Sequence, residues 1–481
     1  MKFKILAFTI IIGLGSCKKE LLNPIPQASI GEEDAFATPE RTLSTVHGIY
    51  AGVKTGAFYG GRFYNYQDIR GEEFLNETSN GVTNLATWNY TVGSSTNEVN
   101  NLWNAAYAAI NRANIVLAGI DKSPVSDQLK NQYRAEARFL RALAYHSLLT
   151  IYARPYTDGN GDKPGVVIYT EPQTKRGENK KSRATVAEGY NLVLEDLNFA
   201  ETNLPETYST PELRVSRAHK NAAIALKTRV YLHMGRYADV IIEADKIVSP
   251  AAPFKAGTGI QHELNADIAP VFRTGLTAEN IMSFPFTTMD LPGTQNSLNS
   301  YYSPGRSSNC LTCSGTGEYS LNTTGNGIAA NTGWTATDAR RTNFVQMIGT
   351  KTWLRKWTAN TDYVPVIRYA EVLLNLAEAL ARTNGLDARA IALLNAVRQR
   401  SDPSTLLAPT TATELVDAIL LERRIELLGE GFRSRDLMRL GMSFPSKGAI
   451  GAVSPTETQY IWPIPSGEIL VNTTVSQNPG Y

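Results

Sequence analysis

The sequence is poor in the residues that carry redox, metal and acid–base chemistry. It has three cysteines and five histidines in 481 residues. The histidines share no metal-ligand spacing, and we interpret His146, which lies in a helical stretch, as a packed core residue. The sequence contains no HExxH, GxSxG, Walker A or dinucleotide-binding motif. We therefore expect a protein that is not an enzyme, with no cofactor and no bound metal.

Excess charge and long apolar runs are also missing. The formal net charge is +2, and Lys2 and Lys4 account for both units if the first sixteen residues are removed. A formally neutral mature chain gives no reason to expect nucleic acid or another polyanion as a partner. Beyond the N-terminus, no stretch reaches the ~20 apolar residues of a membrane-spanning helix.

The N-terminus has the pattern of a targeting segment. Lys2 and Lys4 precede a short apolar run that ends in Leu14-Gly15-Ser16-Cys17, which resembles a bacterial lipobox. We predict a lipoprotein signal peptide over residues 1–16, a lipid on Cys17, and a polar tether over 17–30. The alternative is an ordinary secretory signal with an incidental cysteine.

The two remaining cysteines, Cys310 and Cys313, form a lone CxxC. A structural zinc site needs four ligands, and no helix start follows this pair as a thioredoxin-type thiol would require. In an oxidising compartment the expectation is a tight local disulfide or two idle thiols.

Apolar residues recur at three- and four-residue steps over much of the chain, which predicts a mainly α-helical protein. Two pairs of helices, Ala218 to His233 with Tyr237 to Val248, and Val366 to Thr383 with Ala388 to Arg400, look like degenerate tetratricopeptide hairpins. The other helices are expected at 32–54, 99–120, 128–152 and 185–204. About 250–361 is a loop-rich insertion, where a binding face would be expected.

The stretch 421–441, LERRIELLGEGFRSRDLMRLG, predicts a helix that ends near Gly429 and Gly431. Its mixed charges are expected to pair with one another: Glu422, Arg423, Arg424, Glu426, Glu430, Arg433, Arg435, Asp436 and Arg439.

This stretch resembles the C-terminal hallmark of the SusD/RagB family of outer-membrane nutrient-binding lipoproteins. Similar blocks lie at 101–120, 135–149, 368–379 and 463–481, so the resemblance covers nearly the whole mature chain. It implies a single SusD-like domain over 31–481. It also implies a lipid-anchored surface protein that binds a glycan or another nutrient through loop aromatics. Such a protein delivers its ligand to a SusC-like TonB-dependent outer-membrane transporter.

Loop aromatics beside polar residues suit sugars, because a pyranose offers flat C–H faces for stacking and hydroxyls for hydrogen bonds. We predict ligand contacts from Tyr64, Tyr66, Asp68, Arg70, Trp88, Asn89, Tyr90, Tyr301, Tyr302 and Trp334. The alternative for each ring is that it packs down as a local anchor. Trp103, Trp353, Trp357 and Trp462 are expected in the core.

Two other functions remain as alternatives. A helical-repeat scaffold lipoprotein would bind another protein and leave its loops inert. A glycosidase would use Glu371 and Glu378, but Arg368 and Arg382 flank this pair, so we favour a salt-bridged stripe.

A calcium loop is a further possibility at Asp158, Asn160 and Asp162. Lys163 and Tyr169 stand where a calcium loop needs Gly and Glu, so we favour a polar turn.

Overall fold

The computed structural model of the protein describes residues 34–174 and 180–481. The predicted signal peptide, the lipid site at Cys17 and the tether all lie outside the described residues. Within the described part, no helix combines the length and apolar character needed to cross a bilayer.

The described chain is mainly helical, as predicted. The helices are α1 (Pro39–Val53), α2 (Arg62–Ile69), α3 (Leu85–Trp88), α4 (Asn97–Gly119), α5 (Asp127–Tyr152), α6 (Val186–Asn203), α7 (Pro211–Ser216), α8 (Lys220–His233), α9 (Tyr237–Ala244), α10 (Ala269–Arg273), α11 (Leu298–Tyr302), α12 (Ala339–Phe344), α13 (Tyr369–Asn384), α14 (Ala388–Ser401), α15 (Ala412–Glu426), α16 (Arg433–Arg439) and α17 (Ser466–Val471).

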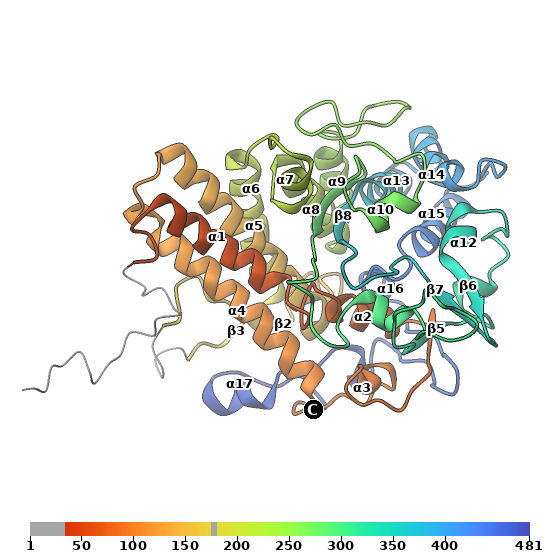
Figure 1. Cartoon of the computed structure of the whole chain (residues 1–481), viewed down its shortest axis with the longest axis horizontal. Coiled ribbons are helices and arrows are strands. Elements are labelled where there is room, and N and C mark those ends of the chain that lie inside the picture. The colour runs from red at the N-terminus through yellow and green to blue at the C-terminus, as the bar shows by residue number, and fades with distance from the viewer. Residues whose placement is uncertain (1–33, 175–179) are drawn as a thin grey trace, which may run out of the picture.

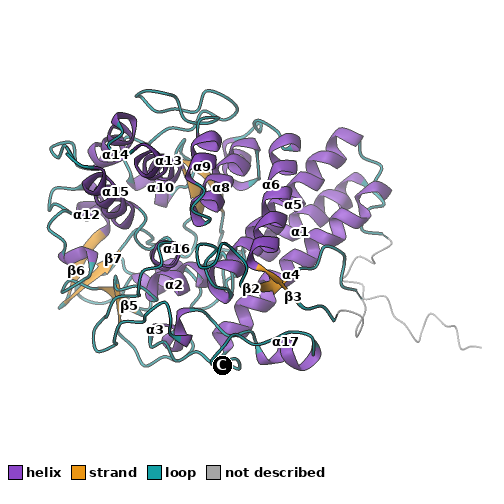
Figure 2. Ribbon diagram, turned by 180° about the vertical axis from the view of Figure 1, so that it is seen from behind, coloured by secondary structure: helices purple, strands orange, loops and turns teal. Residues whose placement is uncertain are grey.

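The long helices form a continuous arc. α1 packs on α4, α4 on α5, α5 on α6, α6 on α8, α8 on α9 and α9 on α13, which also contacts α14 and α15. Figure 1 shows α1, α4, α5 and α6 side by side at one end and α13 to α15 at the other, and Figure 2 shows the same order from behind. Both predicted hairpins, α8 with α9 and α13 with α14, are present.

The strands make four small antiparallel pairs rather than one sheet. They are β1 (Phe74–Asn76) with β5 (Tyr319–Leu321), β2 (Pro164–Val167) with β3 (Arg183–Thr185), β4 (Asn280–Phe284) with β8 (Val364–Arg368), and β6 (Val345–Ile348) with β7 (Lys351–Leu354). Four of these strands, β4 to β7, lie in the predicted loop-rich insertion. The pairs β1–β5 and β4–β8 each join one strand of the insertion to a strand outside it, whereas β6 and β7 form a hairpin within it.

Two local predictions are corrected. Residues 57–66 were expected in a loop, but from Arg62 on they belong to α2, all of whose residues are buried. A helix enclosed on every side shows no amphipathic period in its sequence. Residues 366–368 were expected to begin a helix but belong to β8, where pairing with β4 places Arg368 opposite Asn280.

One apolar core runs through the described chain from Phe36 to Val475. α5 shows why the helices could be predicted from the sequence. Tyr133, Leu140 and Leu148 are buried along one stripe of the helix, and Ser126 caps its N-terminus. The four tryptophans predicted as core, Trp103, Trp353, Trp357 and Trp462, are 1–6% exposed.

The prediction that the charges of the 421–441 stretch pair with one another holds for Asp436, which pairs with Arg423 and Arg439. Most of the other charges pair in the interior with residues outside the stretch. A buried ion cluster joins α15 to β8, α12 and α14 through Arg340, Lys356, Arg368, Arg398 and Arg400 with Glu279, Asp338, Glu422, Glu426 and Glu430. α15 ends at Glu426, close to the predicted position, and Gly429 and Gly431 lie in the turn that follows, with φ of 81° and 73°. Arg435 is the exception, because among the described residues it meets no carboxylate and lies 4.3 Å over Phe432.

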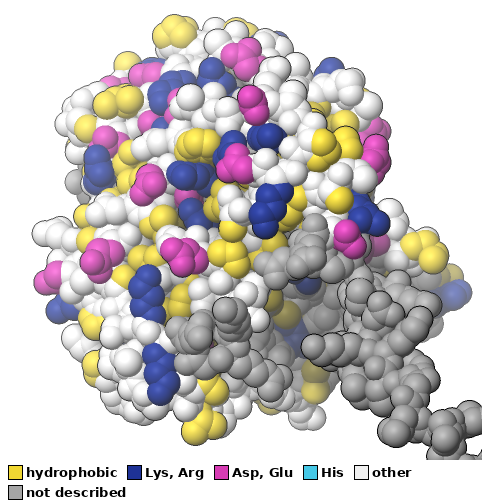
Figure 3. Space-filling model, turned by 90° about the vertical axis from the view of Figure 1, so that its left-hand side faces the viewer, with side chains coloured by type: hydrophobic (Ala, Val, Ile, Leu, Met, Phe, Trp, Pro, Cys, Tyr) yellow, Lys and Arg dark blue, Asp and Glu magenta, His cyan; other side chains and the backbone are white. Residues whose placement is uncertain are grey.

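Figure 3 shows that basic and acidic side chains are interspersed on the face at the arc's outer end. That distribution agrees with a formal net charge of +2.

Cys310 and Cys313 form a disulfide, which is one of the two outcomes expected for them.

Candidate binding site

Most of the predicted ligand-contacting side chains are enclosed in the protein. Eight of the ten are only 0–8% exposed: Tyr64, Tyr66, Asp68, Arg70, Tyr90, Tyr301, Tyr302 and Trp334. The prediction that these side chains lie open to a ligand is wrong, because the loops fold back onto α2 and the C-terminal hallmark. The aromatic rings among these eight residues instead pack inside the protein as local anchors, which was the alternative.

Asp68 shows the role that these buried groups have. Its carboxylate accepts hydrogen bonds from the Tyr302 hydroxyl at 3.0 Å and from the Gly431 N–H at 2.9 Å. Burial raises the pKa of Asp68 to about 7. Tyr64 donates to the carbonyl of Pro365 at 2.9 Å, and Arg70 donates to the carbonyl of Tyr460. These contacts fasten α2 to the insertion and to the C-terminal segment.

Trp88 and Asn89 are half-buried at the end of α3 and remain candidates for ligand contact. The Trp88 indole donates to the carbonyl of Phe74 at 3.0 Å, and the Lys447 ammonium lies 5.6 Å from the Trp88 ring centroid.

The carboxylates of the glycosidase alternative are also enclosed. Glu371 is 1% and Glu378 is 0% exposed. Glu371 pairs with Arg229 at 2.6 Å and Glu378 with Arg439 at 2.7 Å, which confirms the salt-bridged stripe.

In the loop of the possible calcium site, Asp158 pairs with Arg154 at 2.6 Å. Within the described residues, no group of three or more His, Cys, Asp or Glu side chains could hold a metal ion.

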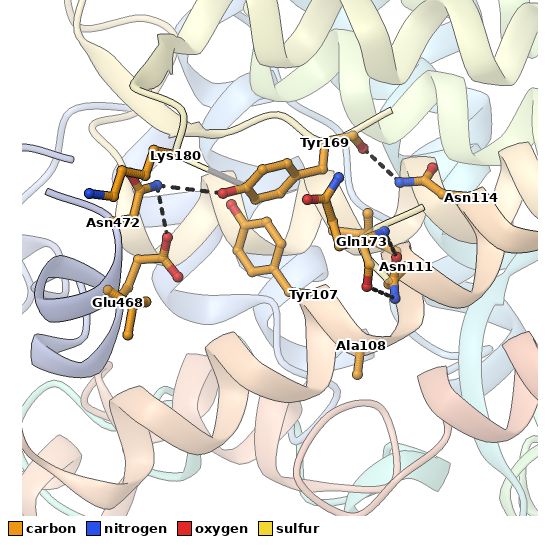
Figure 4. A pocket seen from close by; sticks show the side chains of 11 residues that line it. Tyr107, Ala108, Asn111, Asn114, Tyr169, Gln173, Lys180, Glu468 and Asn472 are labelled. Carbon is orange, nitrogen blue, oxygen red and sulfur yellow. Dashed lines mark hydrogen bonds between the residues drawn. The ribbon is translucent and has the colours of Figure 1, made fainter. Parts of the chain in front are cut away.

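A spacious pocket lies elsewhere, between α4, the segment 169–173 and α17 (Figure 4). It encloses about 820 Å³, which lies within the usual range for ligand sites. Its walls come from three parts of the chain: Tyr107, Ala108, Ile110, Asn111 and Asn114, then Tyr169, Gln173 and Lys180, then Glu468, Val471 and Asn472.

The segment 169–173 is held against α4 by asparagine side chains. Asn111 accepts from the Gln173 N–H at 2.7 Å and donates to the Gln173 carbonyl at 3.2 Å. Asn114 donates to the carbonyls of Tyr169 at 3.0 Å and of Glu171 at 3.1 Å. Since five residues of irregular backbone are fixed before any ligand arrives, the pocket is preorganised.

The third wall is fixed in the same way. Asn472 donates to the Lys181 carbonyl at 2.9 Å and to the Glu468 carboxylate at 3.1 Å. The Trp103 indole donates to the same carboxylate at 3.3 Å. α17 has no buried residue of its own, so these polar bonds contribute to holding it beside α4.

Two tyrosines give the pocket its aromatic surface. The rings of Tyr107 and Tyr169 meet edge to face, with centroids 6.0 Å apart and planes at 75°. Burial and the negative charge of Glu468 raise the pKa of Tyr169 to about 12, and burial raises that of Tyr107 well above its usual value. Both hydroxyls are therefore protonated at neutral pH. A tyrosine ring lies beside the Glu468 carboxylate and the Asn472 amide. This combination suits a saccharide or another ligand that has apolar faces for the ring and hydroxyls for the polar groups.

The sequence contained a signal for this wall that we interpreted differently. Tyr107, Asn111 and Asn114 recur at four- and three-residue steps beside the apolar stripe of α4, and only the apolar stripe entered the prediction. Glu468 and Asn472 lie in the 463–481 block, which entered the prediction only through its resemblance to the family. None of the ten predicted contacts lines this pocket.

Comparisons with known proteins agree on one family. A family model described as "SusD family" matches residues 287–481, and one described as "Starch-binding associating with outer membrane" matches 45–232. The crystal structure of a SusD superfamily protein from Bacteroides fragilis is 31% identical, with a TM-score of 0.81 over 92% of this chain and 100% of that one.

Two curated relatives extend this result. The SusD-like protein P2 of Formosa agariphila is 24% identical across 100% of both chains. The starch-binding protein SusD of Bacteroides thetaiotaomicron is 34% identical over 129 residues, which cover 25% of this chain and 22% of that one.

Proposed function

The chain belongs to the SusD family, and from that premise we propose that it is a lipid-anchored outer-membrane protein that binds a glycan at the cell surface. It passes the bound glycan to a SusC-like TonB-dependent transporter, and no bond in the glycan is broken. The lipid is carried by Cys17, which the lipobox-like sequence favours.

The observation that carries the proposal is the preorganised pocket with its two tyrosines. A sugar ring stacks on the exposed part of a tyrosine face while its hydroxyls reach the Glu468 carboxylate and the Gln173 amide. The description of one matching family model as starch-binding supports the same ligand class. Trp88 and Asn89 are proposed as a second contact for a longer chain.

The test blocks the pocket without touching the core. Ala108 is exposed on α4 and lines the pocket, so Ala108→Trp places an indole where the ligand would lie. Ala118→Trp is the matched control, because Ala118 is exposed on the same helix but does not line the pocket. Binding is measured by calorimetry against laminarin, soluble starch and other neutral glycans.

We expect Ala108→Trp to abolish glycan binding and Ala118→Trp to leave it unchanged. Tyr169→Ala should weaken binding about tenfold or more, as for a buried aromatic contact, and Trp88→Ala should weaken binding of long chains alone. Full binding by Ala108→Trp would refute the pocket. If the wild type binds no glycan but retains a partner protein in pull-downs, the scaffold alternative is correct.

A further inference from the structure

The pocket has an uneven balance of charge. Glu468 is its only lining carboxylate among the described residues, and no Lys or Arg there lies within ion-pairing distance of it. Its two hydrogen-bond partners, Trp103 and Asn472, are neutral. The carboxylate therefore meets no cation among the described residues and has lone pairs left for a ligand.

The hydrogen-bonding groups of the pocket also favour a ligand that donates hydrogen bonds. The Gln173 side-chain oxygen is buried and has no hydrogen-bond partner in the described part of the chain, while its amide nitrogen donates to the Glu171 carbonyl at 3.0 Å. The Tyr107 hydroxyl donates to the Val167 carbonyl at 2.7 Å. The groups left over are thus mainly acceptors, and a bound ligand has to supply donors.

Lys180, the one cation among the described lining residues, does not offset this charge. Lys180 is exposed at the pocket edge, and Figure 4 shows its ammonium pointing away from the two tyrosine rings. An exposed ammonium is screened by water and salt far more than a carboxylate on the pocket wall.

We propose that Glu468 makes this pocket selective by charge, so that it takes saccharides without acidic groups and rejects those carrying carboxylate or sulfate. The inference rests on the proposed glycan-binding function. Hydroxyl and ammonium groups donate to Glu468 and Gln173. An acidic group offers acceptors only, so it leaves both unsatisfied and adds like-charge repulsion.

The experiment compares derivatives of the same polymer. Laminarin and soluble starch are each tested as the neutral polymer, a carboxymethyl derivative and an aminoethyl derivative, at low and at high salt. We expect the wild type to bind the neutral and aminoethyl forms about tenfold more tightly than the carboxymethyl form. High salt should reduce that preference.

Glu468→Gln keeps the side-chain size and an oxygen that can accept from Trp103. It should bring the carboxymethyl form to within about threefold of the neutral form. Lys180→Glu, at an exposed position, should increase the preference for the neutral form over the carboxymethyl form. Glu195→Gln is the control, because it removes the same charge at an exposed site on α6 that does not line the pocket.

The outcomes separate the two proposals. If the wild type binds the neutral polymer but the carboxymethyl form binds as well, or if Glu468→Gln and Lys180→Glu change nothing, the charge inference is overturned and glycan binding stands. If the wild type binds none of the six polymers, the proposed function fails and the inference fails with it.

Discussion

Removal of one cation from the buried ion cluster should cost much of the protein's stability. Arg368 is 1% exposed and contacts Glu430 at 2.7 Å and Glu426 at 2.9 Å, and it also pairs with Glu279. The cluster has five basic and five acidic side chains, so Arg368→Met leaves one negative charge uncompensated in the interior. Loss of one partner of a buried ion pair costs about 3–5 kcal/mol.

That cost is a large part of a typical unfolding free energy of about 5–15 kcal/mol. It is measured by urea unfolding at pH 7, followed by tryptophan fluorescence. Arg41→Met is the control, because Arg41 and Asp34 form an exposed pair at 3.6 Å with side chains 45% and 66% exposed. Loss of an exposed pair should cost about 1 kcal/mol or less.

A double variant isolates the charge imbalance from the loss of packing. Arg368→Met with Glu430→Leu removes one charge of each sign, so its cost should be smaller than the sum of the two single costs by about 1–3 kcal/mol. Strict additivity, or a cost for Arg368→Met no larger than for Arg41→Met, would refute the argument that buried charge balance holds α15 to β8.

Acid should unfold this variant more easily. Burial alone would raise the pKa of Glu426, but Arg400, Arg368 and Arg340 outweigh it and hold that pKa well below the usual value. The stability that results is present above the unfolded pKa of about 4.3 and is lost as the pH falls toward the folded value. With Arg368 removed, the acid unfolding midpoint should move to higher pH.

Two further predictions concern single residues. Burial lowers the pKa of His262 to about 4, so between pH 7 and pH 5 the unfolded chain binds a proton that the folded chain does not, which costs about 2 kcal/mol. His262→Phe should reduce the pH dependence of unfolding by that amount, and unchanged slopes would contradict the assignment. Gly429 has φ of 81°, and an added Cβ would lie 2.5 Å from Leu354 Cδ2. Gly429→Ala should therefore destabilise by about 2–4 kcal/mol in the same urea assay, whereas Gly441→Ala, with φ of 65° and open space around it, should lose only about 1–2 kcal/mol.

Residue spacing along the sequence was enough to determine the helical frame. The stripe of α5 follows from apolar residues at three- and four-residue steps. The paired helices α8 with α9 and α13 with α14 follow from their likeness to tetratricopeptide hairpins, since α8 is buried on nearly every side and shows little amphipathic period. That Glu371, Glu378 and the charges near α15 are paired was also predictable, since arginines are plentiful nearby in the sequence. Most of the actual partners, such as Arg229 for Glu371, lie on other elements and were decided by the tertiary structure. The family followed from the same segments.

Only the tertiary structure decided which aromatic rings are open to a ligand. Tyr64 and Tyr302 have the local sequence of loop residues, yet contacts with Pro365 and Asp68, distant in the chain, bury them. The pocket is assembled from α4, the segment 169–173 and α17, which lie hundreds of residues apart at the extremes. Burial of a side chain depends on which distant segments cover it, and local periodicity contains no information on that.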